Sequence, residues 1–254
     1  MWPGDYPFLL SNLIQKDFKV RYRNMSLGVF WSLLNPLVMM TTLWFVFTKL
    51  FPSPTNPHYA ASILCGLVPY NFFSMAWICG TTSVVDSAGL IKRMTLPREA
   101  VTLASVLSTS VHLAIQIVLL LLVVLLSSCK PGLSWLWLPY VWLMEIIFVC
   151  GLSFITAALN VYIRDIRYVV ESTNLVLFWL VPIVYPFSYI KQEYREIYLY
   201  NPLSAMVLAL RSILIDNVTP ASSTLVKLSY SSIGMLVVGL LFFRHLKRGF
   251  YDYL

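Results

Sequence analysis

Long apolar runs, separated by short polar segments, occupy most of the chain. A helix needs about 20 predominantly apolar residues to cross the hydrocarbon core of a bilayer. Six runs reach or approach that length: residues 28–48, 60–85, 100–128, 135–161, 172–190 and 225–243. The pattern therefore predicts an all-α integral membrane protein, in which residues 1–254 form a single domain with six transmembrane helices.

Residues 5–24, which precede the first run, are amphipathic rather than uniformly apolar. At helical spacing they form two opposite rows, one of Leu10, Ile14, Phe18 and Tyr22, the other of Asn12, Lys16, Lys19 and Arg23. A helix with one apolar and one basic face is typical of the membrane interface. We expect an interface helix here, with the chain turning into the first span around residues 24–28. A plain positively charged flank of that span is the alternative.

Prolines interrupt the pattern in the second half of the chain. Pro182 and Pro186 each remove a backbone donor within the fifth span, so we expect that helix to kink or break in its outer half. Further on, the charge-free run 197–210 is too short to cross the membrane and is interrupted by Asn201-Pro202. Residues 193–216 are therefore expected to form short re-entrant helices that other parts of the protein cover.

The composition supports a membrane protein and argues against a nucleic-acid-binding one. Hydrophobic residues make up 59% of the chain and charged residues only 11%, against roughly 25% charged residues in soluble domains. The formal net charge is +7, but long charge-free runs separate the basic clusters, so no nucleic-acid partner is expected. An inside N-terminus places 12 of the 18 lysines and arginines in the cytoplasm, which predicts cytoplasmic N- and C-termini.

Candidate catalytic chemistry is sparse. No glycine precedes a lysine, so there is no Walker A phosphate loop and this chain is not expected to bind ATP in that manner. The four cysteines lack metal-ligand spacing, so we expect no metal site and no disulfide framework. His112 lies alone within a span, where a hydrogen-bonded interior histidine is favoured over a catalytic one. No residue is therefore assigned a catalytic role.

Glu145 lies about ten residues into the fourth span. An ionised carboxylate at that depth costs about 2.5–3.5 kcal/mol on insertion scales. The side chain is therefore expected to face the interior of the helix bundle or water. We favour a structural, hydrogen-bonded carboxyl over a residue of a transport pathway.

Two charged loops and a set of deep aromatic residues leave alternatives open. Residues 89–99, GLIKRMTLPRE, either dock a soluble partner or only set the topology. Arg164, Asp165 and Arg167 either form a charged network at a cytoplasmic gate or belong to an ordinary short loop. The aromatic residues that lie well inside the predicted spans either pack against protein and lipid or form a stacking surface for sugar rings in a conduit.

Several motifs, taken in order, resemble a known family. RYRNMSLGVFWSLLNPL continues the amphipathic segment, LIKRMTLPRE follows the second span, and YIRDIRY precedes the fifth. PIVYP, NPLSAMVLALR and RHLKRGFYDYL come next, in that order. The series resembles the membrane subunit of ABC-2 type exporters, in the polysaccharide and polyol-phosphate branch that moves O-antigen, capsule or teichoic acid chains.

The resemblance implies a homodimeric permease in the cytoplasmic (inner) membrane, in contact with membrane lipids, that moves a lipid-linked glycan. ATP and Mg²⁺ would be bound by a separate cytoplasmic ABC ATPase subunit. In the family, the interface helix and the loop after the second span contact this ATPase, which carries over to Lys16, Lys19, Arg21, Arg23, Leu90, Ile91, Lys92, Arg93 and Arg98. The first and fifth spans line the conduit, which carries over to Phe30, Trp31, Trp44, Phe178, Trp179 and Tyr185. The alternative functions are an ABC-2 exporter of a drug or lipid and an integral-membrane glycan-modifying enzyme.

Overall fold

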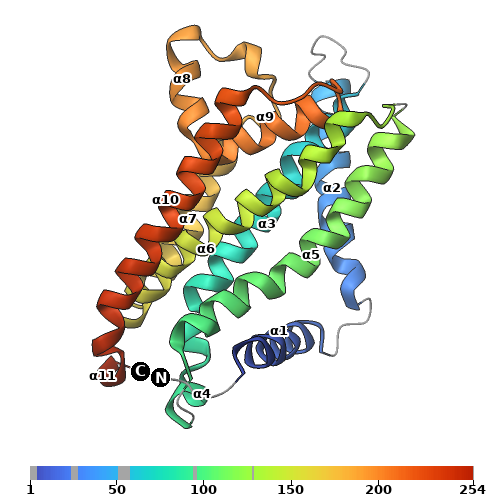
Figure 1. The fold of residues 1–254 in the computed structure, drawn as a ribbon. Helices are drawn as coiled ribbons and strands as arrows, with labels where there is room; N and C mark the ends of the chain where they lie inside the picture. The colour runs from blue at the N-terminus through green and yellow to red at the C-terminus, as the bar shows by residue number, and fades with distance from the viewer. Residues whose placement is uncertain (1–4, 24–27, 51–57, 94–95, 128, 254) are drawn as a thin grey trace.

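The computed structural model describes residues 5–23, 28–50, 58–93, 96–127 and 129–253. Within these ranges the regular structure is entirely helical, which confirms the predicted fold class. Figure 1 shows an elongated bundle whose two termini lie close together. We call the end of the bundle that carries the termini the terminal end, and the end that carries α8 and α9 the opposite end.

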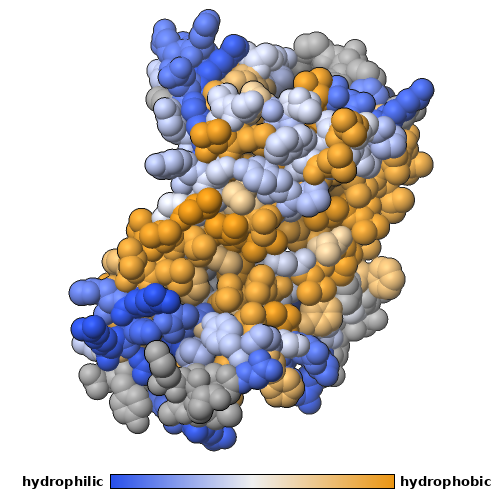
Figure 2. All heavy atoms as spheres, viewed as in Figure 1, coloured by the Kyte–Doolittle hydropathy of each residue, from blue (hydrophilic) through white to orange (hydrophobic). Residues whose placement is uncertain are grey.

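Five described segments are long and apolar enough to cross a membrane, and they match five of the six predicted spans. They are α2 (Trp31–Phe45) with the π-helical η2 (Val46–Leu50), α3 (Tyr59–Asp86), α5 (Arg98–Leu126), α6 (Leu138–Tyr162) and α10 (Ser222–Leu246). Short 3-10 turns precede two of them, η1 (Gly28–Phe30) before α2 and η3 (Leu133–Trp137) before α6. In Figure 2 the visible face has an apolar belt between two polar ends, as expected for a membrane-spanning chain.

Helix α3 is the centre of the bundle, because it packs against α2, α5, α6, α7 and α9. Most of its residues between Ala61 and Val84 are buried, among them Phe73, which stacks on Phe148 of α6. The helices α6 and α10 run side by side in the same direction. Tyr140 and Ser229 share a hydrogen bond near one end of this pair, and the Tyr162 hydroxyl donates to the Leu246 carbonyl, 2.7 Å away, near the other.

The fifth predicted span, residues 172–190, differs in the structure. Helix α7 covers Ile166–Leu180, so it begins and ends earlier than predicted and has only 15 residues. Val181 is extended (φ −80°, ψ 136°) because it precedes Pro182, and a residue before proline is driven out of the helical region. The buried segment 181–184 that follows is not helical, so the expected break at these prolines is present, and it ends the helix rather than bending it.

Two short helices follow at the opposite end, as predicted for residues 193–216. They are α8 (Gln192–Tyr200) and α9 (Pro202–Leu214), reached through the 3-10 turn η4 (Phe187–Tyr189), and they are bent by 99° relative to each other. The bend lies at Asn201-Pro202, where the Asn201 side chain accepts a hydrogen bond from the backbone N–H of Leu203 and caps α9. Helix α9 is largely buried against α3, α6 and α10.

Helix α1 (Tyr6–Tyr22) lies across the terminal end and packs on α5, as Figure 1 shows. Its Leu13 is only 6% exposed and packs with Ala100 and Ala104 of α5. The predicted amphipathic helix is therefore present. Its buried side includes Leu13, which the predicted apolar row did not contain. The predicted turn into the first span lies mostly outside the described residues, but Gly28 at its end has φ +51°, a left-handed conformation that glycine adopts without steric cost.

Candidate functional site

The residues predicted to contact an ATPase lie at the terminal end, most of them on α1 and on α4 (Ala88–Arg93), with Arg23 just after α1 and Arg98 at the start of α5. Leu90 of α4 packs against the same apolar cluster as Leu13 of α1, so the two helices are joined through their inner faces. Their outer faces are basic and solvent-exposed. We call this surface the basic platform and define it by Lys16, Lys19, Arg23, Lys92 and Arg93.

Four of the predicted ATPase contacts point inward instead. Leu90 and Ile91 are partly buried and anchor α4 to the bundle. Arg21 donates to the thiol of Cys79 on α3, at 3.1 Å. Arg98 donates to the backbone carbonyl of Lys247 and lies 5.6 Å from the centre of the Phe250 ring. Helical spacing had already left Arg21 out of the basic row of α1, but nothing in the sequence distinguished Arg98 from the exposed Lys92 and Arg93.

The conduit candidates divide into an exposed and a packed group. Phe30, Trp31, Trp44 and Trp179 are exposed, with 64% of the Trp179 surface accessible. They project from η1, α2 and α7, and both α2 and α7 pack on the central α3. An exposed row of large apolar side chains on a single protomer is suited to a further interface or to lipid.

Phe178 and Tyr185 instead hold the end of α7 in place. Phe178 packs edge-on against Tyr70 of α3, with ring centres 5.3 Å apart. The Tyr185 hydroxyl lies 3.1 Å from the carbonyl oxygens of Trp179 and Leu180 and donates to them. These are carbonyls that the interrupted helix leaves without their usual partners. Both residues therefore have a structural role that the sequence did not indicate.

Arg164, Asp165 and Arg167 do not form an ion-pair network within the described protomer. Arg167 pairs with Glu171 one helical turn later, at 2.8 Å. Arg164 reaches the backbone carbonyl of Tyr253 at 3.5 Å. Asp165 is exposed at the start of α7 and makes no ion pair with either arginine.

A cavity of about 440 Å³ with several polar side chains in its lining, which the sequence did not indicate, lies among α1, α2, α3 and α5. Its lining includes Arg21, Trp31, Asn35 and Asn71, which come from three of these helices. His112 also lines it, and the Tyr22 hydroxyl lies 2.7 Å from the His112 Nε2. The expected hydrogen-bonded interior histidine is thereby confirmed. Its partner, 90 residues away in sequence, had no local signal.

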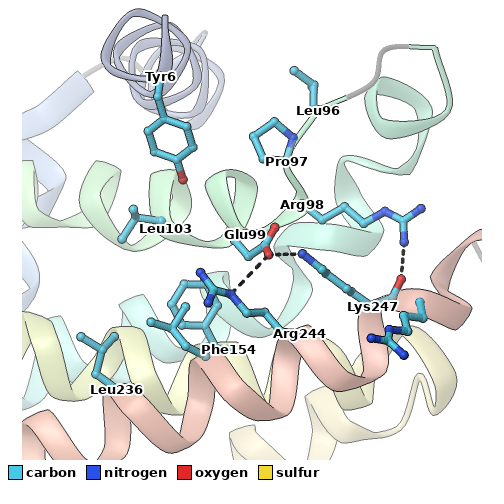
Figure 3. Close-up of a pocket in the computed structure, with 12 residues that line it drawn as sticks. Tyr6, Leu96, Pro97, Arg98, Glu99, Leu103, Phe154, Leu236, Arg244 and Lys247 are labelled. Atoms are coloured by element: carbon cyan, nitrogen blue, oxygen red, sulfur yellow. Dashed lines mark hydrogen bonds and ion pairs between the residues drawn. The ribbon is translucent and has the colours of Figure 1, made fainter. Parts of the chain in front are cut away.

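A second cluster lies at the terminal end, where the start of α5 meets the end of α10. Glu99 accepts a hydrogen bond from Lys247, and its carboxylate lies 3.9 Å from the Nε of Arg244 (Figure 3). Burial, and to a lesser degree the Glu99 carboxylate, raises the pKa of the Tyr6 phenol, so this hydroxyl stays protonated. Figure 3 shows the Tyr6 hydroxyl directed toward this cluster.

Glu145 is fully buried, as expected, but the expected hydrogen bond is absent. Neither of its carboxyl oxygens has a partner among the described residues, so the prediction of a hydrogen-bonded carboxyl is wrong. The described residues also contain no group of acidic, histidine and cysteine side chains arranged to hold a metal ion. The free cysteines Cys65, Cys79, Cys129 and Cys150 form no disulfide.

Comparisons with known proteins agree with this architecture. The model of the ABC-2 type transporter family matches residues 9–215. An O-antigen export system permease protein RfbA of Klebsiella pneumoniae is 31% identical, over 97% of this chain and 95% of its own length. The RfbA protein of Myxococcus xanthus is 27% identical, over 91% and 89%. The polysialic acid transport protein KpsM of Escherichia coli is 23% identical, over 91% of both chains. With its apolar spanning helices, the chain is a multi-pass membrane protein that belongs to the ABC-2 type transporter family.

Proposed function

We propose that this chain is the transmembrane, channel-forming subunit of an ATP-driven exporter that moves a lipid-linked polysaccharide across the cytoplasmic membrane. The observation that carries the proposal is the 31% identity to an O-antigen export permease over 97% of the chain. The similarity to a polysialic acid transport protein points to the same class of cargo. Because ABC-2 membrane subunits transport rather than catalyse, no catalytic residue is assigned here.

ATP binding and hydrolysis would belong to a separate cytoplasmic ATPase, which would hold ATP and Mg²⁺. The absence of a Walker A sequence from this chain supports this division. The basic platform is the docking surface we assign to the ATPase, because α1 and α4 are tied together through Leu13 and Leu90 and would move as one. Both chain termini would then lie in the cytoplasm.

Two copies of the chain would enclose the conduit. The outward faces of α2 and α7 support this arrangement, since Phe30, Trp31 and Trp179 are exposed on a single protomer. In a homodimer these aromatic faces would meet across a central path and stack weakly on sugar rings. The charged residues Arg164, Asp165 and Arg167 would lie near its cytoplasmic mouth, and we retain their gating role as a proposal.

Charge reversal on the basic platform tests the proposal. The double variant Lys92→Glu/Arg93→Glu should lose association with the ATPase subunit, because both side chains are exposed on α4 and packing should not change. Association is measured by co-purification in mild detergent, and export by surface polysaccharide in a strain that lacks the native gene.

The matched control is Lys130→Glu/Lys191→Glu, which reverses two exposed lysines away from the platform. It should bind the ATPase and restore surface polysaccharide. If the platform variant co-purifies with the ATPase as well as the control does, the docking surface is wrong. If deletion of the gene leaves surface polysaccharide intact, the cargo is a different one, such as a drug or a lipid.

A further inference from the structure

A cavity of about 810 Å³ opens at the terminal end, between the start of α5 and the end of α10 (Figure 3). Its outer part is charged and is lined by Arg98, Glu99, Arg244, Lys247 and Arg248. Four cations therefore surround one carboxylate. We call this part the cationic rim.

The inner part of the cavity is apolar. On α10, Leu240 lies one helical turn before Arg244 and Leu236 lies two turns before it, so both lie deeper in the bundle. Leu103 lies one turn beyond Glu99 on α5, and Phe154 of α6 completes this floor. From the terminal end toward the middle of the bundle, the lining thus changes from charged to apolar. A bilayer changes in the same way from its headgroups to its acyl chains.

The cationic rim keeps a net positive charge and a defined geometry. Glu99 binds Lys247 and lies beside Arg244, so one carboxylate is shared by two cations. Arg98 is held by the Lys247 backbone carbonyl and the Phe250 ring, neither of which neutralises its charge. Among the residues whose side chains the structure describes, no other carboxylate forms an ion pair with the rim, in which four cations accompany one carboxylate.

We propose that this cavity binds an anionic phospholipid, with the lipid phosphate at the cationic rim and an acyl chain along Leu103, Leu236 and Leu240. Arginines in pairs suit phosphate oxygens, because guanidinium groups donate two parallel hydrogen bonds. Basic pockets between transmembrane helices are suited to acidic lipid headgroups. A free phosphate would leave the apolar floor unused, so the lining favours a whole lipid.

The bound lipid would join three of the helices that line the cavity. Tyr6 comes from α1, Glu99 from α5 and Arg244 from α10, so one headgroup would contact the interface helix and the last span together. The proposal does not depend on which cargo is exported. It assigns the lipid a role in holding α1 on the bundle.

Titration of the purified permease in detergent, followed by native mass spectrometry, tests the proposal with phosphatidylglycerol and phosphatidylcholine as probes. We expect preferential binding of phosphatidylglycerol. Two basic residues near an anionic lipid surface together change binding about 30-fold, so Arg244→Gln/Arg248→Gln should weaken phosphatidylglycerol binding by about that factor. The control Lys92→Gln/Arg93→Gln removes two exposed cations from α4, outside the cavity, and should leave it unchanged.

A second variant tests the apolar floor and does not disturb the rim. Leu240→Trp should fill the acyl-chain path and weaken phosphatidylglycerol binding, and glycerol 3-phosphate should compete poorly with the lipid. Equal affinity for the two phospholipids, or equal weakening in the α4 control, would overturn the proposal. Glycerol 3-phosphate competing as well as the lipid would show a headgroup-only site. Displacement by a polyprenyl diphosphate at lower concentration would assign the cavity to the cargo.

Discussion

Burial of Glu145 carries a cost that no hydrogen bond among the described residues offsets. Its side chain has no exposed surface on α6, and both carboxyl oxygens lack hydrogen-bond partners among the described residues. The hydrogen bonds that join Tyr140 to Ser229 and Tyr162 to Leu246 place Glu145 at about the level of Ser232 on α10. The Ser232 hydroxyl is itself buried without a partner. Two such polar groups in a bundle interior are unfavourable, and costly polar groups at this depth commonly serve transport.

Replacement of this carboxyl separates a structural from a transport role. Glu145→Met should raise the free energy of unfolding by about 1–3 kcal/mol, because it removes a buried polar group that has no partner. Thermal unfolding in detergent measures this, with Glu145→Gln as the control that keeps a polar side chain of similar size. A lower midpoint for Glu145→Met would mean that the carboxyl holds the fold together. A higher midpoint with lost export would place it in the transport path.

The exposed tryptophans are the residues on which the conduit proposal depends. Trp31→Ala and Trp179→Ala should slow polysaccharide export severalfold and leave the proposed homodimer intact, because each removes the proposed stacking face of an exposed side chain. Export is followed by the appearance of surface polysaccharide, and the dimer by size-exclusion chromatography. Tyr230→Ala is the control, since Tyr230 is an exposed aromatic residue on α10, outside the proposed conduit. Normal export in both tryptophan variants would rule out stacking.

At the scale of elements, the pair of α6 and α10 depends on two glycines. A Cβ added to Gly239 would overlap the carbonyl oxygen of Gly151, and one added to Gly151 would overlap the backbone at Met235 and Leu236. Small residues let helix backbones approach in a membrane, where dispersion contacts replace the hydrophobic effect as the driving force. The close approach also keeps Arg244 and Lys247, at the end of α10, beside Glu99 of α5.

Gly239→Leu should therefore force α10 away from α6 and destabilise the bundle by about 1–3 kcal/mol, the usual cost of overpacking. Gly234→Leu is a matched control on the same helix, because nothing lies within 4 Å of a Cβ added there. The comparison is made by thermal unfolding of the two purified variants. Equal midpoints would mean that α6 and α10 separate without cost.

The interrupted α7 shows how local chemistry sets the length of an element. Pro182 ends the helix at Leu180 because the residue before a proline leaves the helical region. The Tyr185 hydroxyl then satisfies the carbonyls of Trp179 and Leu180. The sequence predicted the break at these prolines but not the role of Tyr185, because that side chain reaches the end of α7 only after the chain has folded back.

At the scale of the whole molecule, α1, α4 and α11 (Phe250–Tyr253) share one end of the bundle and α8 and α9 the other, as Figure 1 shows. The basic platform and the cationic rim both lie at the terminal end. Excess positive charge favours retention of a segment in the cytoplasm. Force from an ATPase at this end would reach α5 through α1, because Leu13 packs on Ala100 and Ala104.

Cysteine labelling tests this orientation. In a cysteine-free background, Lys130→Cys should react with a membrane-impermeant maleimide added outside whole spheroplasts, because the proposed topology exposes it there. Arg93→Cys should react only after the membrane is opened. Both side chains are exposed in the protomer. The reverse pattern would invert the proposed topology.

The sequence by itself determined the membrane class, five of the spans, the interface helix and the bent pair at the opposite end. These follow from hydrophobic runs, helical spacing and prolines, which act over a few residues and can be read locally. The order of motifs was enough to indicate the family, since that order extends along nearly the whole chain.

Only the tertiary structure decided which charged and aromatic side chains face inward. Arg98 and Lys247 are 149 residues apart, and Tyr22 and His112 are 90 apart, so no local pattern could pair them. Arg93 and Arg98 belong to the same predicted ATPase-contacting loop, but Arg98 donates to the Lys247 carbonyl and Arg93 is exposed. The physical reason is that the helical period decides which residues share one face of a helix. Which other helix that face contacts is decided only when the bundle packs.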